Sequence, residues 1–347
     1  MGEAERASRV PSETEPRSRA SLRAVARSVR AFAARGLQRS LPRRWLVALL
    51  ARRAPRAATV EVTTACQLRC PLCPTHDRER GTRFLPAASF ARLLEGAHRL
   101  RTVSFHILGD PALHPELYAF VRACRERGVH TGFSTNGLRL EQQVHEVLDS
   151  GLEFLQVAID GVDEEGYGRY RVGGSLKAVT RGVRALLAER ERRGLRTPFV
   201  QLQTIMFPYN EAREEEVVSF LESFGADDLR LKRPSYCAEG GGFALTEEAA
   251  AFLELAGPDR ERLRWSRVGP GAGVRYRDRP VCPQLLRATV LSDGRVVACC
   301  MDSTGETAIG DLERATLAEI WRGPRRRGLL EAFLERRLEL CEHCDLA

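Results

Sequence analysis

The stretch Thr64-Ala65-Cys66-Gln67-Leu68-Arg69-Cys70-Pro71-Leu72-Cys73-Pro74 places three thiols within eight residues, directly after a strand-like segment at 58–63. Soft thiolate sulfur suits iron-sulfur clusters, and close spacing lets one loop wrap a cubane. Thiolates from Cys66, Cys70 and Cys73 would bind three irons and leave the fourth iron open as a reaction site. The alternatives are a zinc site, with His76 as the nearest fourth ligand, and three incidental thiols.

Short apolar runs alternate with longer stretches of helical period between about residues 58 and 232, which indicates repeated β-α units and a parallel sheet. Glycines follow four of the helical stretches, where left-handed caps are expected. We predict an α/β fold, a partial (β/α)6 TIM-like barrel, with active-site groups in the loops after the strands. The predicted strands are 58–63, 102–107, 130–134, 154–159, 199–206 and 228–232, the helices are 87–100, 115–127, 140–150, 176–193 and 211–224, and the caps are Gly128, Gly151, Gly194 and Gly225.

Changes in composition divide the 347 residues into four parts. Residues 1–56 are an Arg-rich N-terminal extension, predicted to be partly helical or disordered, and residues 57–233 form the barrel. A bridging segment, 234–281, leads to a small C-terminal cysteine-rich α+β domain at 282–347. This last part is predicted to hold a hairpin of 287–291 with 295–298, and helices near 317–322 and 327–338.

The net charge of +8 lies in the extension, which holds 14 Arg against 4 Glu and leaves about −2 for the rest. A basic leader without interleaved aromatic residues does not make a nucleic-acid-binding domain, so we do not expect a nucleic-acid substrate. The longest uninterrupted apolar run of the extension, Trp45 to Ala51, is too short to span a membrane. Ten clustered cysteines in a long chain without an evident signal peptide indicate metal binding in a reducing cytoplasm, rather than disulfides.

The CX3CX2C pattern after the first strand of a six-unit β-α domain resembles the radical S-adenosylmethionine (radical SAM) superfamily. The resemblance implies a 4Fe-4S cluster whose open iron binds S-adenosylmethionine, a 5′-deoxyadenosyl radical that removes a substrate hydrogen, and a reducing electron donor of the flavodoxin or ferredoxin type. Leu108-Gly109-Asp110-Pro111, after the second strand, is similar to the family's Gly-Gly-Glu-Pro stretch. It departs from that stretch at Leu108 and at Asp110, whose shorter acid would receive the methionine ammonium.

Three further stretches look like family positions. Ser134 and Asn136, after the third strand, would hydrogen-bond the ribose or the carboxylate of S-adenosylmethionine, although Ser-x-Asn-Gly is by itself an ordinary turn. Asp160, after the fourth strand, would orient cofactor or substrate, and Arg171 would pair with the methionine carboxylate. Gln201 and Gln203 alternate on the fifth strand, so both could line the interior.

A second cysteine group comprises Cys282, Cys299, Cys341 and Cys344, and its spacing fits either a zinc site or a 4Fe-4S cluster. It resembles the SPASM/Twitch-type extension behind some radical enzymes, and its four matching cysteines imply one auxiliary 4Fe-4S cluster. Cys300 adjoins Cys299, but the spacing from Gly294 selects Cys299. Cys124, in a predicted helix, is expected to be buried packing.

Three functions remain open from the sequence. A fully ligated auxiliary cluster suits electron transfer, so the first is oxidation of a hydroxylated small molecule with that cluster as electron acceptor. The second is modification of a peptide substrate by a maturase or epimerase, in which Cys237, just past the sixth strand, would donate a hydrogen atom. The third is a non-catalytic metal-binding module.

Overall fold

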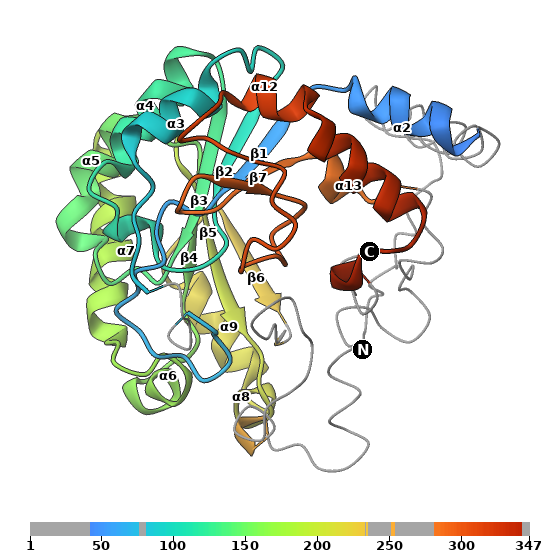
Figure 1. The fold of residues 1–347 in the computed structure, drawn as a ribbon. Coiled ribbons are helices and arrows are strands. Elements are labelled where there is room, and N and C mark those ends of the chain that lie inside the picture. Colours follow the sequence, from blue (N-terminus) through green and yellow to red (C-terminus); the bar gives the residue numbers. More distant parts are fainter. Residues whose placement is uncertain (1–41, 76–80, 233, 235–250, 254–280, 342–347) are drawn as a thin grey trace, which may run out of the picture. The chain divides into compact units, whose positions relative to one another are not determined.

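A computed structural model describes residues 42–75, 81–232, 234, 251–253 and 281–341 (Figure 1). The chain forms two compact units, residues 1–46 and residues 47–347. Of the first unit, the described part is Pro42 with the start of helix α2 (Arg43–Ala51). The sheet and the predicted sites that the structure describes belong to the second unit.

The described residues form a nine-stranded sheet in the order β6-β5-β4-β3-β2-β1-β7-β8-β9. Its first six strands pair in parallel, as predicted, and each lies next to its neighbour in sequence. The carboxyl ends of these strands therefore meet at one edge, where parallel sheets bind ligands. The strands are β1 (Ala57–Val60), β2 (Thr102–Phe105), β3 (His130–Thr135), β4 (Phe154–Ala158), β5 (Phe199–Ile205) and β6 (Asp228–Lys232).

Helices follow the strands and cover one face of the sheet (Figure 1). The four predicted cap glycines all have positive φ, between 63° and 80°, which only glycine adopts at little cost. The α6 helix and the short α8 helix were not predicted. The helices of this part are α3 (Ala87–Leu94), α4 (Leu117–Glu126), α5 (Val144–Ser150), α6 (Glu164–Tyr170), α7 (Leu176–Arg192), α8 (Pro208–Glu211) and α9 (Glu214–Glu222), with 3-10 turns η1 (Pro111–Leu113) and η2 (Glu141–Gln143).

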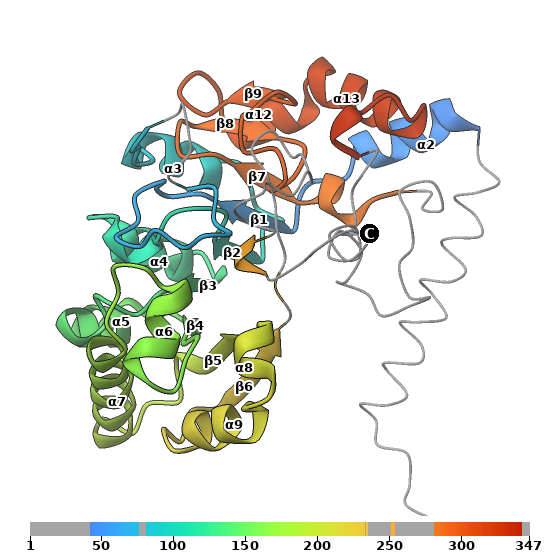
Figure 2. The same cartoon turned by 90° about the horizontal axis from the view of Figure 1, so that it is seen from below.

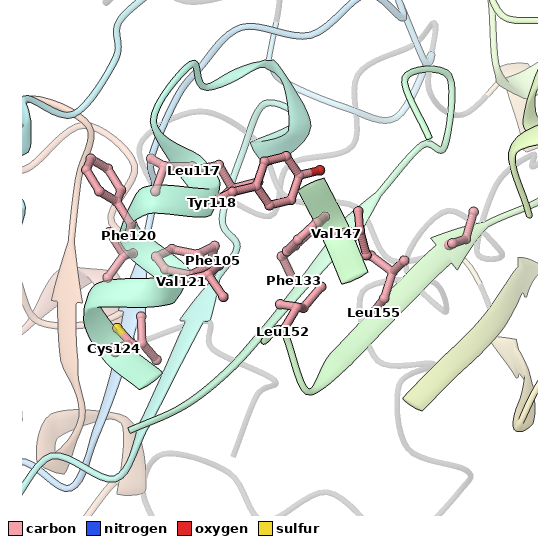
Figure 3. Close-up of a cluster of buried hydrophobic side chains, with 14 of the residues drawn as sticks. Phe105, Leu117, Tyr118, Phe120, Val121, Cys124, Phe133, Val147, Leu152 and Leu155 are labelled. Atoms are coloured by element: carbon pink, nitrogen blue, oxygen red, sulfur yellow. The ribbon is translucent and has the colours of Figure 1, made fainter. Parts of the chain in front are cut away.

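The core fills the space between these helices and the sheet. Phe105 and Phe133 of adjacent strands pack with Val121 and Cys124 of α4, all at most 2% exposed (Figure 3). Cys124 is therefore buried packing, as expected. Among the described helices, none is both long enough and apolar enough to cross a membrane.

The C-terminal hairpin does not make a sheet of its own. Strand β7 (Ala288–Val290) pairs in parallel with β1, and β8 (Arg295–Val297) and β9 (Gly310–Asp311) add antiparallel strands (Figure 2). All three residues of β7 are buried, because β7 covers the edge of β1 that the barrel strands leave open. The buried carboxylate of Glu61, just after β1, accepts hydrogen bonds from Ser292 N (3.0 Å) and Oγ (2.8 Å) at the hairpin turn.

Helices α12 (Leu317–Arg322) and α13 (Pro324–Leu334) follow the hairpin, and the 3-10 turns η5 (Pro283–Leu286) and η6 (Glu339–Cys341) flank this region. Thr316 and Glu319 form a capping box at the start of α12, which satisfies two amide groups at the helix terminus. This part of the chain carries the second cysteine group.

Candidate active site

The loop after β1 carries the first three cysteines. Two threonines fix its start, because Thr63 Oγ1 donates to Arg83 O (2.7 Å) and Thr64 Oγ1 donates to Gly81 O (2.8 Å). Within the loop, Leu68 N donates to Cys66 Sγ at 3.5 Å. Side chains of Cys66 and Cys73 pack against a small buried cluster that contains Cys70. The loop therefore brings the three thiols together at the carboxyl edge of the sheet.

The environment of these thiols suits metal ligation rather than free thiolates. Burial raises the pKa of the Cys66 thiol, and it raises the pKa of Cys70 to about 11 against the opposing charge of Arg171. Binding a metal centre must therefore displace their protons. In the described part of the chain no three His, Cys, Asp or Glu side chains converge on one metal-ion position, and a cubane does not require this, because each thiolate binds its own iron.

The turn after β2 lies directly against the cysteine loop. Gly109 has φ of +70°, and a Cβ there would lie 2.3 Å from Thr63 O, so the position admits only glycine. The next amide, Asp110 N, donates to Ala65 O at 2.7 Å. Pro111 begins the turn η1. The Gly109-Asp110-Pro111 stretch thus positions the backbone that precedes Cys66.

The Asp110 carboxylate is 2% exposed and already engaged. It accepts hydrogen bonds from Ala112 N (2.9 Å), Asn136 N (2.8 Å) and Thr135 Oγ1 (2.9 and 3.0 Å to its two oxygens). Burial raises its pKa, and these donors oppose the rise. The carboxylate therefore ties the turn after β2 to the turn after β3, which is the role that the structure shows for it.

Asp110→Asn is expected to destabilise the fold by about 1–3 kcal/mol, because an amide NH2 must face either Ala112 N or Asn136 N. Urea unfolding and the affinity for S-adenosylmethionine would both be measured. Asp149→Asn is the matched control, since Asp149 is an exposed partner of Arg193. Equal unfolding midpoints for the two variants would contradict this role of Asp110.

Ser134 lies near the end of β3, Asn136 directly follows that strand, and both line the cavity described below. Asn136 Nδ2 donates to Gln67 Oε1 at 3.1 Å and lies 3.8 Å from Cys66 Sγ, and its Oδ1 accepts from Leu138 N at 3.0 Å. Asn136 therefore makes the turn that its sequence predicts and also contacts the cysteine loop.

Asp160 and Arg171 form a buried ion pair. Arg171 Nε donates to Asp160 Oδ2 at 2.5 Å, with side chains 14% and 0% exposed. Asp160 Oδ1 accepts from Ile205 N (2.6 Å), and Arg171 Nη1 lies 3.7 Å from Cys70 Sγ. Burial lowers the pKa of Arg171, but the charges of Asp160 and Cys70 outweigh it and raise that pKa well above its ordinary value. The guanidinium is thus a permanent cation beside the cysteine loop.

A cavity of about 490 Å³ opens on the inner face of the parallel strands. Strand alternation creates it: on β4, Leu155 and Val157 enter the core, whereas Gln156 and Ala158 line the cavity. Gln203 also lines it, as predicted, whereas Gln201 donates to Asp228 Oδ2 at 2.5 Å. The lining includes every predicted cofactor residue except Pro111 and Asp160, together with the three cysteines: Cys66, Cys70, Cys73, Gly109, Asp110, Ser134, Asn136 and Arg171.

Sequence reasoning missed several polar lining residues, among them His106, Gln156, Arg230 and Lys232. The two-residue period of the predicted strands could have indicated them, because it places Arg230 and Lys232 on one face of β6. Burial lowers the pKa of His106, and the positive charge of Lys232 adds to that effect. The side chains of His106 and Lys232 are therefore close enough in the cavity for the charge of Lys232 to affect the imidazole.

The auxiliary cysteines are partly described. Cys282 directly precedes η5, Cys299 follows β8, and Cys341 ends η6, all of them half-buried. Because β8 ends at Val297, Cys299 and Cys300 lie in a turn, so strand alternation does not choose between them. Cys237 and Cys344 lie outside the described residues, as does His76.

Comparison with known families decides the class of the protein. The sequence profile of the Radical SAM superfamily matches residues 60–221, and that of SPASM, an iron-sulfur cluster-binding domain, matches residues 282–345. The chain belongs to the radical SAM superfamily. It is a radical SAM enzyme whose cofactors are a 4Fe-4S cluster, S-adenosylmethionine and auxiliary iron-sulfur.

Curated relatives of this radical SAM enzyme differ in activity. PqqA peptide cyclase of Gluconobacter oxydans (strain 621H) is 27% identical over 77% of this chain and 76% of its own length. A tungsten-containing aldehyde ferredoxin oxidoreductase cofactor-modifying protein of Pyrococcus furiosus is 26% identical over 49% of each chain. A GTP 3′,8-cyclase of Chlorobaculum tepidum is 26% identical over 50% of this chain and 51% of its own. For the last two, the matched region is about half of each relative.

Solved structures of radical SAM enzymes share the fold. Streptococcus suis SuiB bound to its precursor peptide SuiA superposes with a TM-score of 0.56 at 13% identity, over 97% of this chain and 79% of that chain. The protein anSMEcpe with bound AdoMet gives a TM-score of 0.54 at 14% identity, over 83% of this chain and 89% of that chain. At these identities the likeness supports the open α/β architecture and nothing finer.

Proposed function

We propose that Cys66, Cys70 and Cys73 hold the S-adenosylmethionine-binding 4Fe-4S cluster of this enzyme. The donor set fits: three soft sulfurs lie on one loop, with Leu68 N and Arg171 as hydrogen-bond donors to two of them. When bound, cluster and S-adenosylmethionine together supply a 5′-deoxyadenosyl radical that removes a hydrogen atom from the substrate. Ser134, Asn136 and Arg171 surround the space for S-adenosylmethionine, and Asp110 holds the two adjoining turns in place.

We further propose that the substrate is a peptide. Its support is the match to PqqA peptide cyclase, which extends over about three quarters of both chains. In this proposal the second cysteine group would hold the auxiliary cluster, which would supply an acceptor for the electron that the substrate loses. Oxidation of a hydroxylated small molecule is the second candidate, because Ser104, Gln156 and Gln203 give the cavity hydrogen-bonding side chains suited to hydroxyl groups.

Protease sensitivity of the substrate would separate the two candidates. The reconstituted enzyme, under anaerobic conditions with dithionite and S-adenosylmethionine, would be given an extract of its own host, and 5′-deoxyadenosine would be counted. A peptide substrate predicts stimulation that disappears when the extract is first treated with protease and the protease is then inactivated. Stimulation that survives protease and passes an ultrafilter would reject the peptide and favour the small molecule.

The ligands proposed for the auxiliary cluster are Cys282, Cys299, Cys341 and Cys344. Cys299→Ala is expected to lose the iron of one cluster and to reduce product formation at least about tenfold. Cys300→Ala, which changes the neighbouring residue in the same turn, is expected to keep the iron of both clusters and the normal rate of product formation. Iron and sulfide counts with product analysis measure this. The opposite pattern would assign Cys300 as the ligand, and product formation at the normal rate without the second cluster would reject an electron-acceptor role.

A further inference from the structure

One face of strand β6 presents two cations to the cavity. Arg230 and Lys232 are two residues apart on the strand, so their side chains leave the same face, and both line the cavity. They pair in register with Gln203 and Ile205 of β5. They therefore lie toward the carboxyl ends of the strands, where an open α/β sheet binds its ligands.

The other charged side chains of the described lining are engaged by neighbouring residues. Among the described lining residues Asp110 is the one carboxylate, and it is buried and engaged by three donor groups. Arg171 is balanced by Asp160. Arg230 is exposed to the cavity and forms no ion pair with a described residue. Arg230 therefore presents its charge to the cavity, and Lys232 lies beside it on the same face of β6.

The pair of cations suits an anionic ligand in two complementary ways. A guanidinium presents a planar fork that binds carboxylate or phosphate through two hydrogen bonds, and an ammonium adds a compact point charge. The field of Lys232 reaches into the cavity, because it lowers the pKa of His106 on β2, on top of the larger effect of burial. His106 is therefore favoured as a neutral imidazole that can donate a further hydrogen bond.

We propose that Arg230 and Lys232 bind an anionic group of the substrate, a carboxylate or a phosphate, and hold the substrate in the cavity beside the loop of Cys66, Cys70 and Cys73. The inference rests on the proposed function in one respect, namely that the cavity receives the substrate. The anion site would accept either a peptide with an acidic group or a small anionic molecule. The anion-site proposal can therefore fail while the peptide proposal holds, and the reverse is also possible.

Lysine labelling tests the site without turnover. The chain has 52 arginines but only two lysines, Lys232 and Lys177, and Lys177 lies exposed on α7. The reconstituted enzyme would be acetylated briefly at one ionic strength in sodium chloride, glutarate or inorganic phosphate, and the two lysines would be quantified by mass spectrometry.

Glutarate or phosphate is expected to slow acetylation of Lys232 severalfold relative to chloride and to leave Lys177 unchanged, and the probe that protects better identifies the group. In Arg230→Gln, equal protection should need about tenfold more of that probe. Acetylation of Lys232 at the same rate in all three salts would overturn the proposal.

Substrate titration is the second, independent measurement. With the stimulating host fraction, Arg230→Gln should raise the amount needed for half-maximal deoxyadenosine formation about tenfold and change the limiting rate and the KM for S-adenosylmethionine less than about twofold. Arg192→Gln is the control, because Arg192 is exposed on α7 and pairs with Glu189. Carbodiimide amidation of the fraction should abolish stimulation if the group is a carboxylate, and phosphatase should do so if it is a phosphate.

Two outcomes of this titration would overturn the inference. The first is a rise in the KM for S-adenosylmethionine in Arg230→Gln with unchanged dependence on the host fraction, which would assign Arg230 to the cofactor. The second is stimulation that resists both amidation and phosphatase. Stimulation that resists protease but is lost on amidation would reject the peptide proposal and would still support the anion site.

Discussion

Cys70→Ala is expected to reduce deoxyadenosine formation to background, a loss well beyond the roughly 10- to 100-fold typical of outer-shell changes at metal sites. Cys70 is the most buried of the three loop thiols, and a cubane held by three cysteines has no spare protein ligand. The variant should lose one cluster's iron and the electron paramagnetic resonance signal that responds to S-adenosylmethionine, while the auxiliary signal remains.

Cys124→Ala is the matched control for this prediction. Cys124 is fully buried in α4, away from the loop, so its removal leaves a small cavity and should cost about 1–2 kcal/mol of stability without loss of iron. Retention of S-adenosylmethionine cleavage in Cys70→Ala would contradict the proposed ligand set. Zinc in place of iron in the wild-type protein would contradict it more directly.

The sequence predicted the parallel part of the fold because that part depends on local patterns. The predicted strand 228–232, in which Leu229 and Leu231 alternate with charged residues, coincides with β6, and Leu176, the predicted start of a helix, begins α7. Gly151 was predicted to be a left-handed cap for the same kind of local reason and has φ of 80°. Each of these features is decided by a few neighbouring residues.

Features that depend on distant contacts could not be read in this way. The pairing of β7 with β1 joins residues more than 200 positions apart, and no local pattern states which edge a hairpin covers. Asp110 was predicted as an acceptor for the cofactor amine, and only the structure shows that residues of the next turn already engage it. Likewise Arg171 was assigned to a ligand before its ion pair with Asp160 was visible.

Removal of the ion pair between Arg171 and Asp160 is the second change for which we expect a large effect. Arg171→Gln is expected to destabilise the protein by about 3–5 kcal/mol, because it leaves the carboxylate of Asp160, which is 0% exposed, without its countercharge. The urea midpoint should fall accordingly. Arg192→Gln removes an ion pair whose arginine is 70% exposed, and it should change stability by no more than about 1 kcal/mol.

A double variant separates the charge effect from general damage. In Asp160→Asn with Arg171→Gln no charge is left buried, and an asparagine oxygen can still accept from Ile205 N, which lies 2.6 Å from Asp160 Oδ1. The double variant should therefore be more stable than Arg171→Gln alone. If it were less stable, the ion pair itself would not be the source of the loss.

Arg171 also has an electrostatic effect that the same variants reveal. Its Nη1 lies 3.7 Å from Cys70 Sγ, and a cation that donates to a ligand sulfur favours the reduced, more negative form of a cluster. Both Arg171→Gln and the double variant should therefore lower the midpoint potential of the cluster proposed on Cys66, Cys70 and Cys73, whatever their stabilities. A potentiometric titration followed by electron paramagnetic resonance measures this. An unchanged potential in the double variant would show that Arg171 acts only by neutralising Asp160, whereas a lowered potential would show that its charge also favours the reduced cluster.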